Sequence, residues 1–372
     1  MRPLTLDRDL FDELADRGGS DLISIFTPTH SKGRDVSQDR IRLKNLLGDA
    51  DSHLEELGFK PRERKDRLRL ARDLLDDREF WEHQAEGLAI YIDDDGEMNP
   101  VSLDHEVAES AYVMPVFVMR PLLADLTRPE MQVLALTRGE VGLFEATTAS
   151  ARRIAVDLPE SLDDVNWFVD RERQRQQHPD RTDTGRARHG HDPSVREEED
   201  LARFLREVDR ALKGNGPLIV LGDDELVSRF DDVTDRGVIS PDNSGVRSPF
   251  TETEILEIAG PVAHSLISDR ESKAVAEAKE QIGAGNATTD IDVAVQGALS
   301  GRIGHVVVDP ATNPVWGRID ESTMDVAIHG EKQHADVDLV DRVIVLSMRN
   351  GADVTPIQDQ PGEFPLIAIN RF

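Results

Sequence analysis

The chain has 372 residues, of which 38% are hydrophobic and 31% are charged. At about 100 to 200 residues per domain, this length predicts two or three domains, each able to bury a core. The absence of cysteine excludes disulfides and thiolate metal sites. The longest apolar run, 112–119, is shorter than the roughly 20 residues of a membrane-spanning helix, and the acidic N-terminus does not resemble a secretory signal. We therefore expect a cytoplasmic protein without a membrane partner.

The chain is strongly acidic, with 73 Asp and Glu against 44 Lys and Arg and a formal charge of −29. This charge argues against DNA as a partner and against non-specific wrapping of nucleic acid, because phosphate binding depends on Lys and Arg. A local basic patch remains compatible with it. The excess of acids and the low count of 8 Lys against 36 Arg fit two explanations, adaptation to high salt and a GC-rich genome. The sequence does not separate them.

Residues 1–128 are predicted to form an N-terminal α/β domain. Apolar residues recur at helical spacing over 36–57, and Pro61 suits the first turn of a helix running to about Leu75. Short apolar runs predict strands at 22–26 and 87–92, with weaker ones near Val101 and Val113.

Residues 129–262 are predicted to form a middle domain that opens with three short strands. These are expected at 133–136, 141–144 and 153–156. The apolar pattern lapses over 166–199, which predicts a long polar loop, and a helix resumes near Val195. A strand at 218–221 and a further helix follow, with Asp223 or Asp224 as a cap. Three strands followed by helix, strand and helix predict an RNase H-like layer arrangement.

Residues 263–372 are predicted to form a C-terminal domain, after a helix-rich connector over 251–283. Helical and strand patterns alternate along this part of the chain, which predicts a small α/β/α sandwich. The expected elements are helices at 293–299 and 337–348 and strands at 303–308, 315–319, 354–357 and 366–369.

Several short sequence words occur in a characteristic order along the whole chain. They are Arg42–Leu47, Leu74–Asp77, Phe80–Gln84, Gly87–Ala89, Leu143–Ala146, Val156–Pro159, Gly351–Val354 and Ile367–Phe372. In this order they resemble the bacterial archaeo-eukaryotic release factor family, whose members are relatives of class-one release factors, Pelota and the hibernation factor Balon. The resemblance implies a third domain similar to kink-turn-binding ribosomal proteins. It also implies the ribosome or tRNA as partner, a translational GTPase or the ribosomal stalk as a contact of the third domain, and a role in hibernation or rescue under stress.

One departure from the release-factor pattern concerns catalysis. Release factors hydrolyse peptidyl-tRNA with a Gly-Gly-Gln tripeptide, but the corresponding segment here reads RTDTGRARHGHD, and Gly-Gly-Gln occurs nowhere in the chain. Gly18-Gly19 is followed by Ser20 and lies in the wrong domain. We therefore predict a non-catalytic factor with no cofactor.

The predicted loop contains the most basic stretch of this acidic chain. Guanidinium groups pair with phosphate and stack on bases, so the stretch predicts contact with RNA, whereas a solvated loop without a partner is the alternative. In the related factors this loop enters the peptidyl-transferase centre. The candidate RNA-contacting residues are Arg171, Arg173, Arg175, Arg181, Arg186, Arg188, His189 and His191.

Clusters of acidic residues and of histidines are candidate metal sites. His189, His191 and Asp192 form at most half of a zinc site, because further ligands at suitable spacing are missing. Asp157, Asp223 and Asp224 could serve a two-metal nuclease on an RNase H-like fold, although helix capping explains Asp223 better. The run 93–97 is interpreted as a hairpin turn. A metal-dependent nuclease or hydrolase, and a protein-interaction module without RNA, therefore stand as alternatives to the translation factor.

Overall fold

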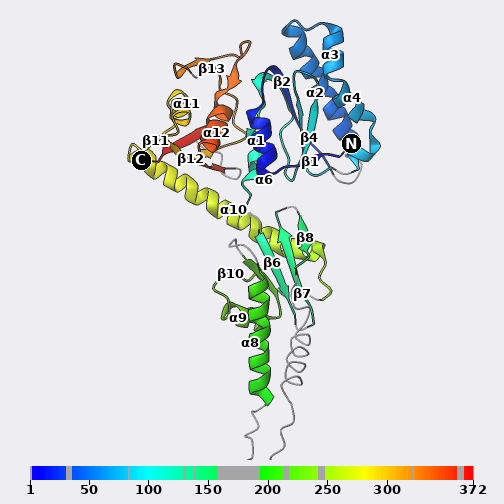
Figure 1. The fold of residues 1–372 in the computed structure, drawn as a ribbon, viewed down its shortest axis with the longest axis vertical. Coiled ribbons are helices and arrows are strands. Elements are labelled where there is room, and N and C mark those ends of the chain that lie inside the picture. Colours follow the sequence, from blue (N-terminus) through cyan, green and yellow to red (C-terminus); the bar gives the residue numbers. More distant parts are fainter. Residues whose placement is uncertain are drawn as a thin grey trace, which may run out of the picture. The chain divides into compact units, whose positions relative to one another are not determined.

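The computed structural model describes residues 2–30, 36–82, 84–128, 131–137, 139–148, 150–156, 193–212, 218–241, 248–320, 322–357 and 364–371. The chain divides into two compact units, and Figure 1 labels the elements of both. Unit 1 combines Met1–Arg128 with Ser268–Phe372, and unit 2 is Pro129–Ile267.

The N-terminal part of unit 1 is built on a five-stranded sheet with the order β1-β4-β3-β2-β5. Neighbouring strands are antiparallel except β1 and β4, which are parallel. The hairpin β3–β4 and the long strand β2 therefore form the centre of the sheet. The strands are β1 (Leu4–Thr5), β2 (Gly18–Pro28), β3 (Gly87–Ile92), β4 (Met98–Leu103) and β5 (Ser110–Val116).

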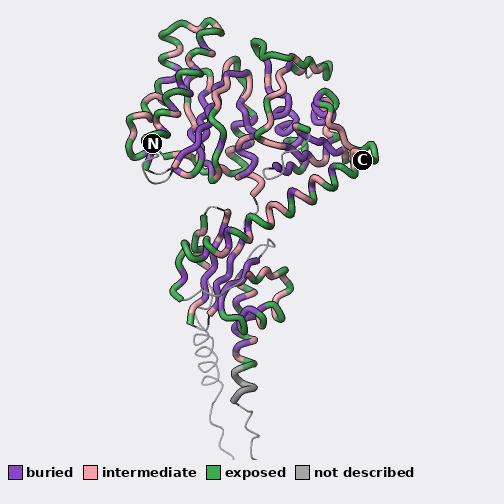
Figure 2. Tube along the Cα trace, turned by 180° about the vertical axis from the view of Figure 1, so that it is seen from behind, coloured by how far each residue is buried: buried purple, intermediate pink, exposed green. Residues whose placement is uncertain are grey.

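Helices cover both faces of this sheet because its central strands are apolar on both sides. Ile23 and Ile25 of β2 pack in a core with α2 (Val36–Glu56), whereas Leu22 and Phe26 belong to a second core that includes α1 (Arg8–Asp16). Figure 2 shows the buried strands between more exposed helical surfaces. Short helical segments complete this part: α3 (Pro61–Arg67), α4 (Arg69–Asp73), η1 (Leu74–Asp76), α5 (Arg78–Trp81), η2 (Arg120–Leu122) and α6 (Leu123–Leu126).

The predicted helix from Pro61 to about Leu75 is not continuous. Pro61 begins it as expected, but the backbone leaves helical geometry at Leu68, where φ is −89° and ψ is 5°. Leu68 and Ala71 are both fully buried, and a short α-helix and a 3-10 turn follow. Helical periodicity alone gives no sign of this break, since the apolar spacing continues across it.

Unit 2 has a five-stranded sheet with the order β10-β9-β6-β7-β8. Strands β6, β7 and β8 are antiparallel, β9 is parallel to β6, and β10 is parallel to β9. This order and direction confirm the predicted RNase H-like arrangement. The strands are β6 (Met131–Leu136), β7 (Val141–Ala146), β8 (Ala151–Ile154), β9 (Leu218–Gly222) and β10 (Val238–Ile239).

Two faces of the unit 2 sheet are covered by different helices. Helices α8 (Pro193–Ala211) and α9 (Asp224–Asp231) pack on one face through a core that includes Phe204 and Phe230. The other face packs against α10 (Glu252–Gly283) through Ile255, Ala259 and Ala263. The predicted helix-rich connector is therefore one helix of 32 residues, with Pro261 inside it.

The C-terminal part of unit 1 is the predicted α/β/α sandwich. Its sheet has the order β11-β17-β12-β16, with α11 (Ile291–Leu299) and α12 (Leu339–Arg349) on one face. Ala274 and Ala278 of α10 lie in the core on the other face. The strands are β11 (Ala287–Thr288), β12 (Ile303–Val308), β16 (Asp353–Pro356) and β17 (Leu366–Asn370).

A separate three-stranded sheet, β14-β13-β15, joins this part and was not predicted as a sheet. The strand expected at 315–319 is β13 (Trp316–Asp320), but β14 (Asp325–His329) and β15 (Val337–Asp338) lie in a polar stretch without an alternating apolar pattern. With a sheet in each of three sequence regions, the α/β class is confirmed, while the division into three domains and its boundaries stay a prediction.

Candidate functional site

The predicted RNA-contacting residues, Arg171 through His191, lie outside the described residues, as do Asp157 and Asp192. The described elements on either side of them are β8 and α8, which belong to the unit 2 sheet and its helical layer. The candidate RNA-contacting residues therefore lie, in the sequence, between the last antiparallel strand of the unit 2 sheet and the first helix that covers this sheet.

Two arginines of β8 form ion pairs with neighbouring glutamates. Arg152 pairs with Glu145, and Arg153 pairs with Glu140 at 3.1 Å while its guanidinium lies 5.7 Å from the centre of the Phe144 ring. These two ion pairs link β8 to β7 and to the residue that precedes it.

The acidic residues after β9 form no metal centre in the described structure. Asp223 occupies the N-cap position of α9 as predicted, but its side chain makes no capping hydrogen bond. Asp224 and Glu225 lie in the first turn, where the positive end of the helix dipole stabilises carboxylates. Among the described residues, no group of three His, Asp or Glu side chains could hold a metal ion. This placement gives the nuclease alternative no specific support.

The acidic run 93–97 forms the predicted hairpin turn between β3 and β4. Asp93 accepts hydrogen bonds from the backbone amides of Asp95 and Glu97. Asp94 accepts from the amides of Ser20 and Asp21 and pairs with Arg67. Burial raises the pKa of Asp94, but these hydrogen bonds and Arg67 outweigh it, so the net pKa is lowered. The carboxylates of this turn therefore fix the loop.

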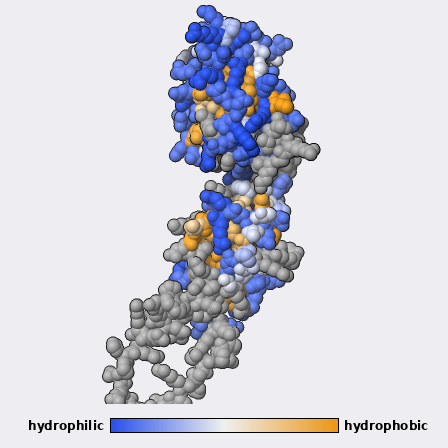
Figure 3. Space-filling view, turned by 90° about the vertical axis from the view of Figure 1, so that its right-hand side faces the viewer, coloured by the Kyte–Doolittle hydropathy of each residue, from blue (hydrophilic) through white to orange (hydrophobic). Residues whose placement is uncertain are grey.

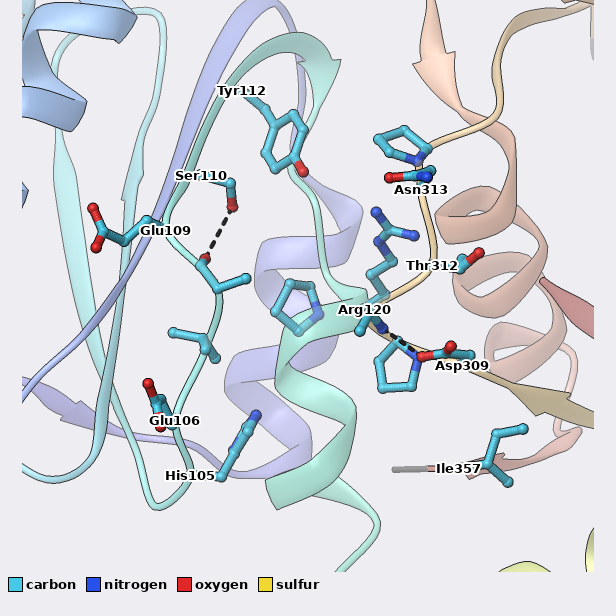
Figure 4. A pocket seen from close by; sticks show the side chains of 16 residues that line it. His105, Glu106, Glu109, Ser110, Tyr112, Arg120, Asp309, Thr312, Asn313 and Ile357 are labelled. Carbon is cyan, nitrogen blue, oxygen red and sulfur yellow. Dashed lines mark hydrogen bonds between the residues drawn. The ribbon is translucent and has the colours of Figure 1, made fainter. Parts of the chain in front are cut away.

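A cavity of about 520 Å³ lies within unit 1, between the N-terminal and C-terminal sheets. Figure 4 shows residues 105–112 on one side, residues 309–313 on the other, and Arg120 between them. The connection between β4 and β5 supplies the first wall, and the turn after β12 supplies the second. Two segments that are about 200 positions apart in the sequence thus meet only in the folded unit.

The imidazole of His105 is fixed at one end of this cavity. Its Nδ1 lies 3.1 Å from Oδ1 of Asp125, which also pairs with Arg128 at 2.8 Å. Because the carboxylate engages Nδ1, the ring orientation is set and Nε2 is left for other contacts.

Arg120, which lines the cavity, also belongs to a buried ionic cluster. Its side chain is 5% exposed, and its Nε lies 3.3 Å from Oδ2 of Asp338, whose side chain is 2% exposed. Asp338 caps α12, and its Oδ1 accepts from the amides of Val340 and Val315. The guanidinium charge is therefore balanced by a neighbouring carboxylate.

Asp341 joins the two sheet systems of unit 1. Its Oδ1 accepts hydrogen bonds from the backbone amides of Met119, at 2.7 Å, and Arg120, at 2.6 Å. Burial, reinforced by the charge of Asp338, raises the pKa of Asp341 to about 7. Burial also raises the pKa of Asp338, against the opposing effect of Arg120.

The ionic cluster of Arg120, Asp338 and Asp341 is not among the predicted sites. One signal was available: Asp341 and Arg342 interrupt the apolar helix LVDRVIVLSM, which is almost entirely buried. A charged residue at a core position indicates a buried partner. The partner itself, at Arg120, was not recognisable because no local pattern links the two segments.

Comparison with known proteins gives a family and several distant structures. Residues 130–302 match the model of bacterial archaeo-eukaryotic release factor family 3. No curated protein matches the chain. This confirms the resemblance to the bacterial archaeo-eukaryotic release factor family, on the part of the chain that holds the RNase H-like sheet and α10.

Among solved structures, the crystal structure of the archaeal translation termination factor aRF1 is 14% identical, with 99% of each chain covered and a TM-score of 0.26. The model of ribosome-bound archaeal Pelota and ABCE1 gives 11% identity over 98% of this chain and 93% of that chain, with a TM-score of 0.36. The crystal structure of Archaeoglobus fulgidus Pelota is 13% identical, with 77% of this chain and 79% of that chain covered and a TM-score of 0.30. Because these TM-scores are low, the fold assignment rests on the strand orders described above.

No helix in the described parts of the chain is both long and apolar enough to cross a membrane.

Proposed function

We propose that the chain is a non-catalytic release-factor-like protein that binds the ribosome or tRNA, with ribosome hibernation or rescue as its specific role. The observation that carries this proposal is the match of residues 130–302 to a release-factor family in a chain that lacks Gly-Gly-Gln. The family match supports a function in translation, and the missing tripeptide removes the group that positions water for ester hydrolysis.

The charge distribution supports RNA as the ligand of the middle domain. Six Arg and three His occur between Arg171 and His191, against Glu172, Asp180 and Asp183, in a chain of charge −29. A cationic segment on an acidic protein directs phosphate to one place, since the rest of the surface repels it. For the C-terminal sandwich, the family resemblance supports a translational GTPase or the ribosomal stalk as partner.

Co-sedimentation with 70S ribosomes from stationary-phase cells, in low and high salt, tests the proposal. The pelleted fraction should fall as salt rises, because contacts to phosphate release counterions. Replacing Arg186 and Arg188 by Gln should weaken binding roughly tenfold, through loss of two charge-assisted contacts. Peptidyl-tRNA on the same ribosomes should remain intact.

A matched control changes the same charge elsewhere in the middle domain. Arg203 and Arg206 are exposed on α8, and Arg203→Gln with Arg206→Gln should leave pelleting close to that of the unmodified protein. Equal loss in both double variants would indicate a general effect of charge. Absence of pelleting at low salt would refute the proposal.

A further inference from the structure

Strand β14 (Asp325–His329) lies at the edge of its sheet. In the order β14-β13-β15, the only neighbour of β14 among the described strands is β13. Figure 1 shows this small sheet, labelled at β13, at the periphery of the C-terminal part of unit 1. An edge strand presents backbone donors and acceptors along its free side, and a further strand can pair with them.

The hydrogen bonds on the other side of β13 show which of its residues bond to β14. Between β13 and β15, the amide of Leu339 donates to the carbonyl of Val315 at 2.8 Å. The next pair, Trp316 opposite Asp338, is therefore of the non-hydrogen-bonded type, because the two types alternate in an antiparallel ladder. Trp316 and Arg318 thus direct their backbone groups away from β15 and toward β14.

Two residues of β14 direct their backbone groups outward as a result. Ala327 lies opposite Arg318, so it belongs to a hydrogen-bonded pair of the hairpin. Val326 and Ile328 flank it, and their N–H and C=O groups point to the free side of the strand. Ala327 is exposed, and Ile328 is 51% exposed. The free side therefore combines backbone groups available for pairing with an exposed β-branched side chain.

The sequence of β14 complements its own reversed copy. When two copies run antiparallel and are centred on Ala327, Val326 lies opposite Ile328 of the second copy, and Asp325 lies opposite His329 of the second copy. In this register the outward backbone groups of Val326 and Ile328 meet as hydrogen-bonded pairs. The two Ala327 residues form a non-hydrogen-bonded pair with Cα atoms about 4.5 Å apart, a spacing that their methyl side chains allow.

The charges at the two ends of the strand select this register. Asp325 is exposed. Nδ1 of His329 lies 2.8 Å from Oδ2 of the buried Asp336, so Nε2 is the ring nitrogen left for a carboxylate of the second copy. Every other symmetric register places Asp325 or His329 beyond the end of the opposing strand. Pairs of opposite charge and of β-branched side chains both stabilise antiparallel strands.

We propose that β14 is a dimerisation edge, to which a second copy of this chain adds its own β14 in the antiparallel register centred on Ala327. The two small sheets then become one continuous sheet across a twofold axis, as in other isologous dimers. A second copy suits this edge because the charges and apolar side chains of the strand match those of the same strand reversed. The inference concerns unit 1 and is independent of the proposed ribosome binding.

Sedimentation velocity of the full chain tests the association. The runs cover about 5 to 500 μM protein, because a small interface gives a weak dimer. They use 0.15 M salt, where a Debye length of about 8 Å screens the repulsion between two chains of charge −29. We expect a reversible equilibrium between monomer and dimer.

Asp325→Lys tests the charge pairing. The new cation lies opposite His329 at both ends of the paired strands, so the dissociation constant should rise about tenfold or more. Glu280→Lys makes the same change of charge at an exposed position of α10 and should leave the dissociation constant unchanged. Both positions are exposed, and circular dichroism checks that both variants fold.

A disulfide tests the register separately. Because the chain has no cysteine, Ala327→Cys introduces a single thiol at the twofold axis, where the close Cα atoms suit a disulfide. Mild oxidation should give a covalent dimer on a non-reducing gel. Ile328→Cys is the matched control, since its Cα atoms in the two copies are more than about 7 Å apart and should cross-link far more slowly.

The proposal is overturned if the chain stays monomeric over the whole concentration range. It is equally overturned if a dimer forms but Asp325→Lys associates like Glu280→Lys, or if Ala327→Cys cross-links no faster than Ile328→Cys. Either of these results would show that the dimer uses another surface or another register.

Discussion

Among the single residues of unit 1, the buried Asp341 has a pKa raised from 3.8 to about 7. It is 1% exposed, and its environment includes Asp338, Arg120 and the hydroxyl of Tyr91, whose pKa is raised by burial and by the Asp341 charge. The Asp341 carboxyl accepts hydrogen bonds from two backbone amides, but burial and the nearby Asp338 disfavour its charged form.

Asp341 predicts a loss of stability as the pH rises. The unfolded chain releases this proton near pH 3.8, whereas the folded chain holds it to about 7. Between these values the folded state binds more protons, so the free energy of unfolding falls with rising pH and levels off above about 7. Asp341→Asn, which keeps the accepting oxygen, should flatten this slope in urea unfolding followed from pH 4 to 8.

The comparison with Asp341→Ala separates charge from hydrogen bonding. This substitution leaves the amides of Met119 and Arg120 unpaired and, relative to Asp341→Asn, should cost about 3 kcal/mol at every pH. Carboxylates with lowered pKa values, such as Asp94 and Asp336, lose their stabilising effect only below about pH 4. They therefore do not contribute to the slope measured between pH 4 and 8. An unchanged slope in Asp341→Asn would contradict the assignment.

At the scale of elements, α10 takes part in the cores of both units. Ala259 and Ala263 pack in unit 2, and Ala274 and Ala278 pack in unit 1. Small side chains let a helix approach a sheet closely. A larger side chain at these positions would therefore overlap with the packed residues of the sheet.

We expect Ala263→Leu and Ala278→Leu to destabilise different units, each by about 1 to 3 kcal/mol through overpacking. Hydrogen exchange should accelerate in β6 and β9 for the first substitution, and in β12 and β17 for the second. Ala276→Leu, at an exposed position of the same helix, should change neither. Acceleration in both sheets from either buried substitution would show that the units unfold together.

At the scale of the whole molecule, charge is the leading property. Most of the face in Figure 3 that is not grey is hydrophilic, which agrees with a chain of charge −29. Ion pairs such as Arg8–Asp12 and Arg78–Glu82 offset a part of this charge locally. The remaining acids repel each other in the compact state more than in the unfolded chain.

Added salt should therefore raise the melting temperature, by roughly 5 to 10 °C between low ionic strength and 1 M NaCl. Most of the increase should occur below about 0.3 M, where the Debye length shortens most. Differential scanning calorimetry measures the shift, with sucrose as a control for preferential exclusion. A melting temperature that falls with salt, or rises only in sucrose, would show that self-repulsion is minor.

Local patterns predicted most of the elements correctly. The strands at 303–308 and 366–369 and the helices at 36–57 and 293–299 agree closely with β12, β17, α2 and α11. Each is a strong apolar run or period, so its structure follows from local burial alone. The break at Leu68 and the strand β14 were missed because neither changes the apolar pattern.

The α/β class, the order of most elements, the absence of Gly-Gly-Gln and the family resemblance follow from the amino-acid sequence, because they depend on local periodicity and on words of a few residues. The cavity around Arg120, the pairing of Arg120 with Asp338 and the contact of Asp341 with two amides exist only in the folded chain. These features join segments more than 200 positions apart, and such contacts arise from the packing of two sheets, which no local pattern of side chains specifies.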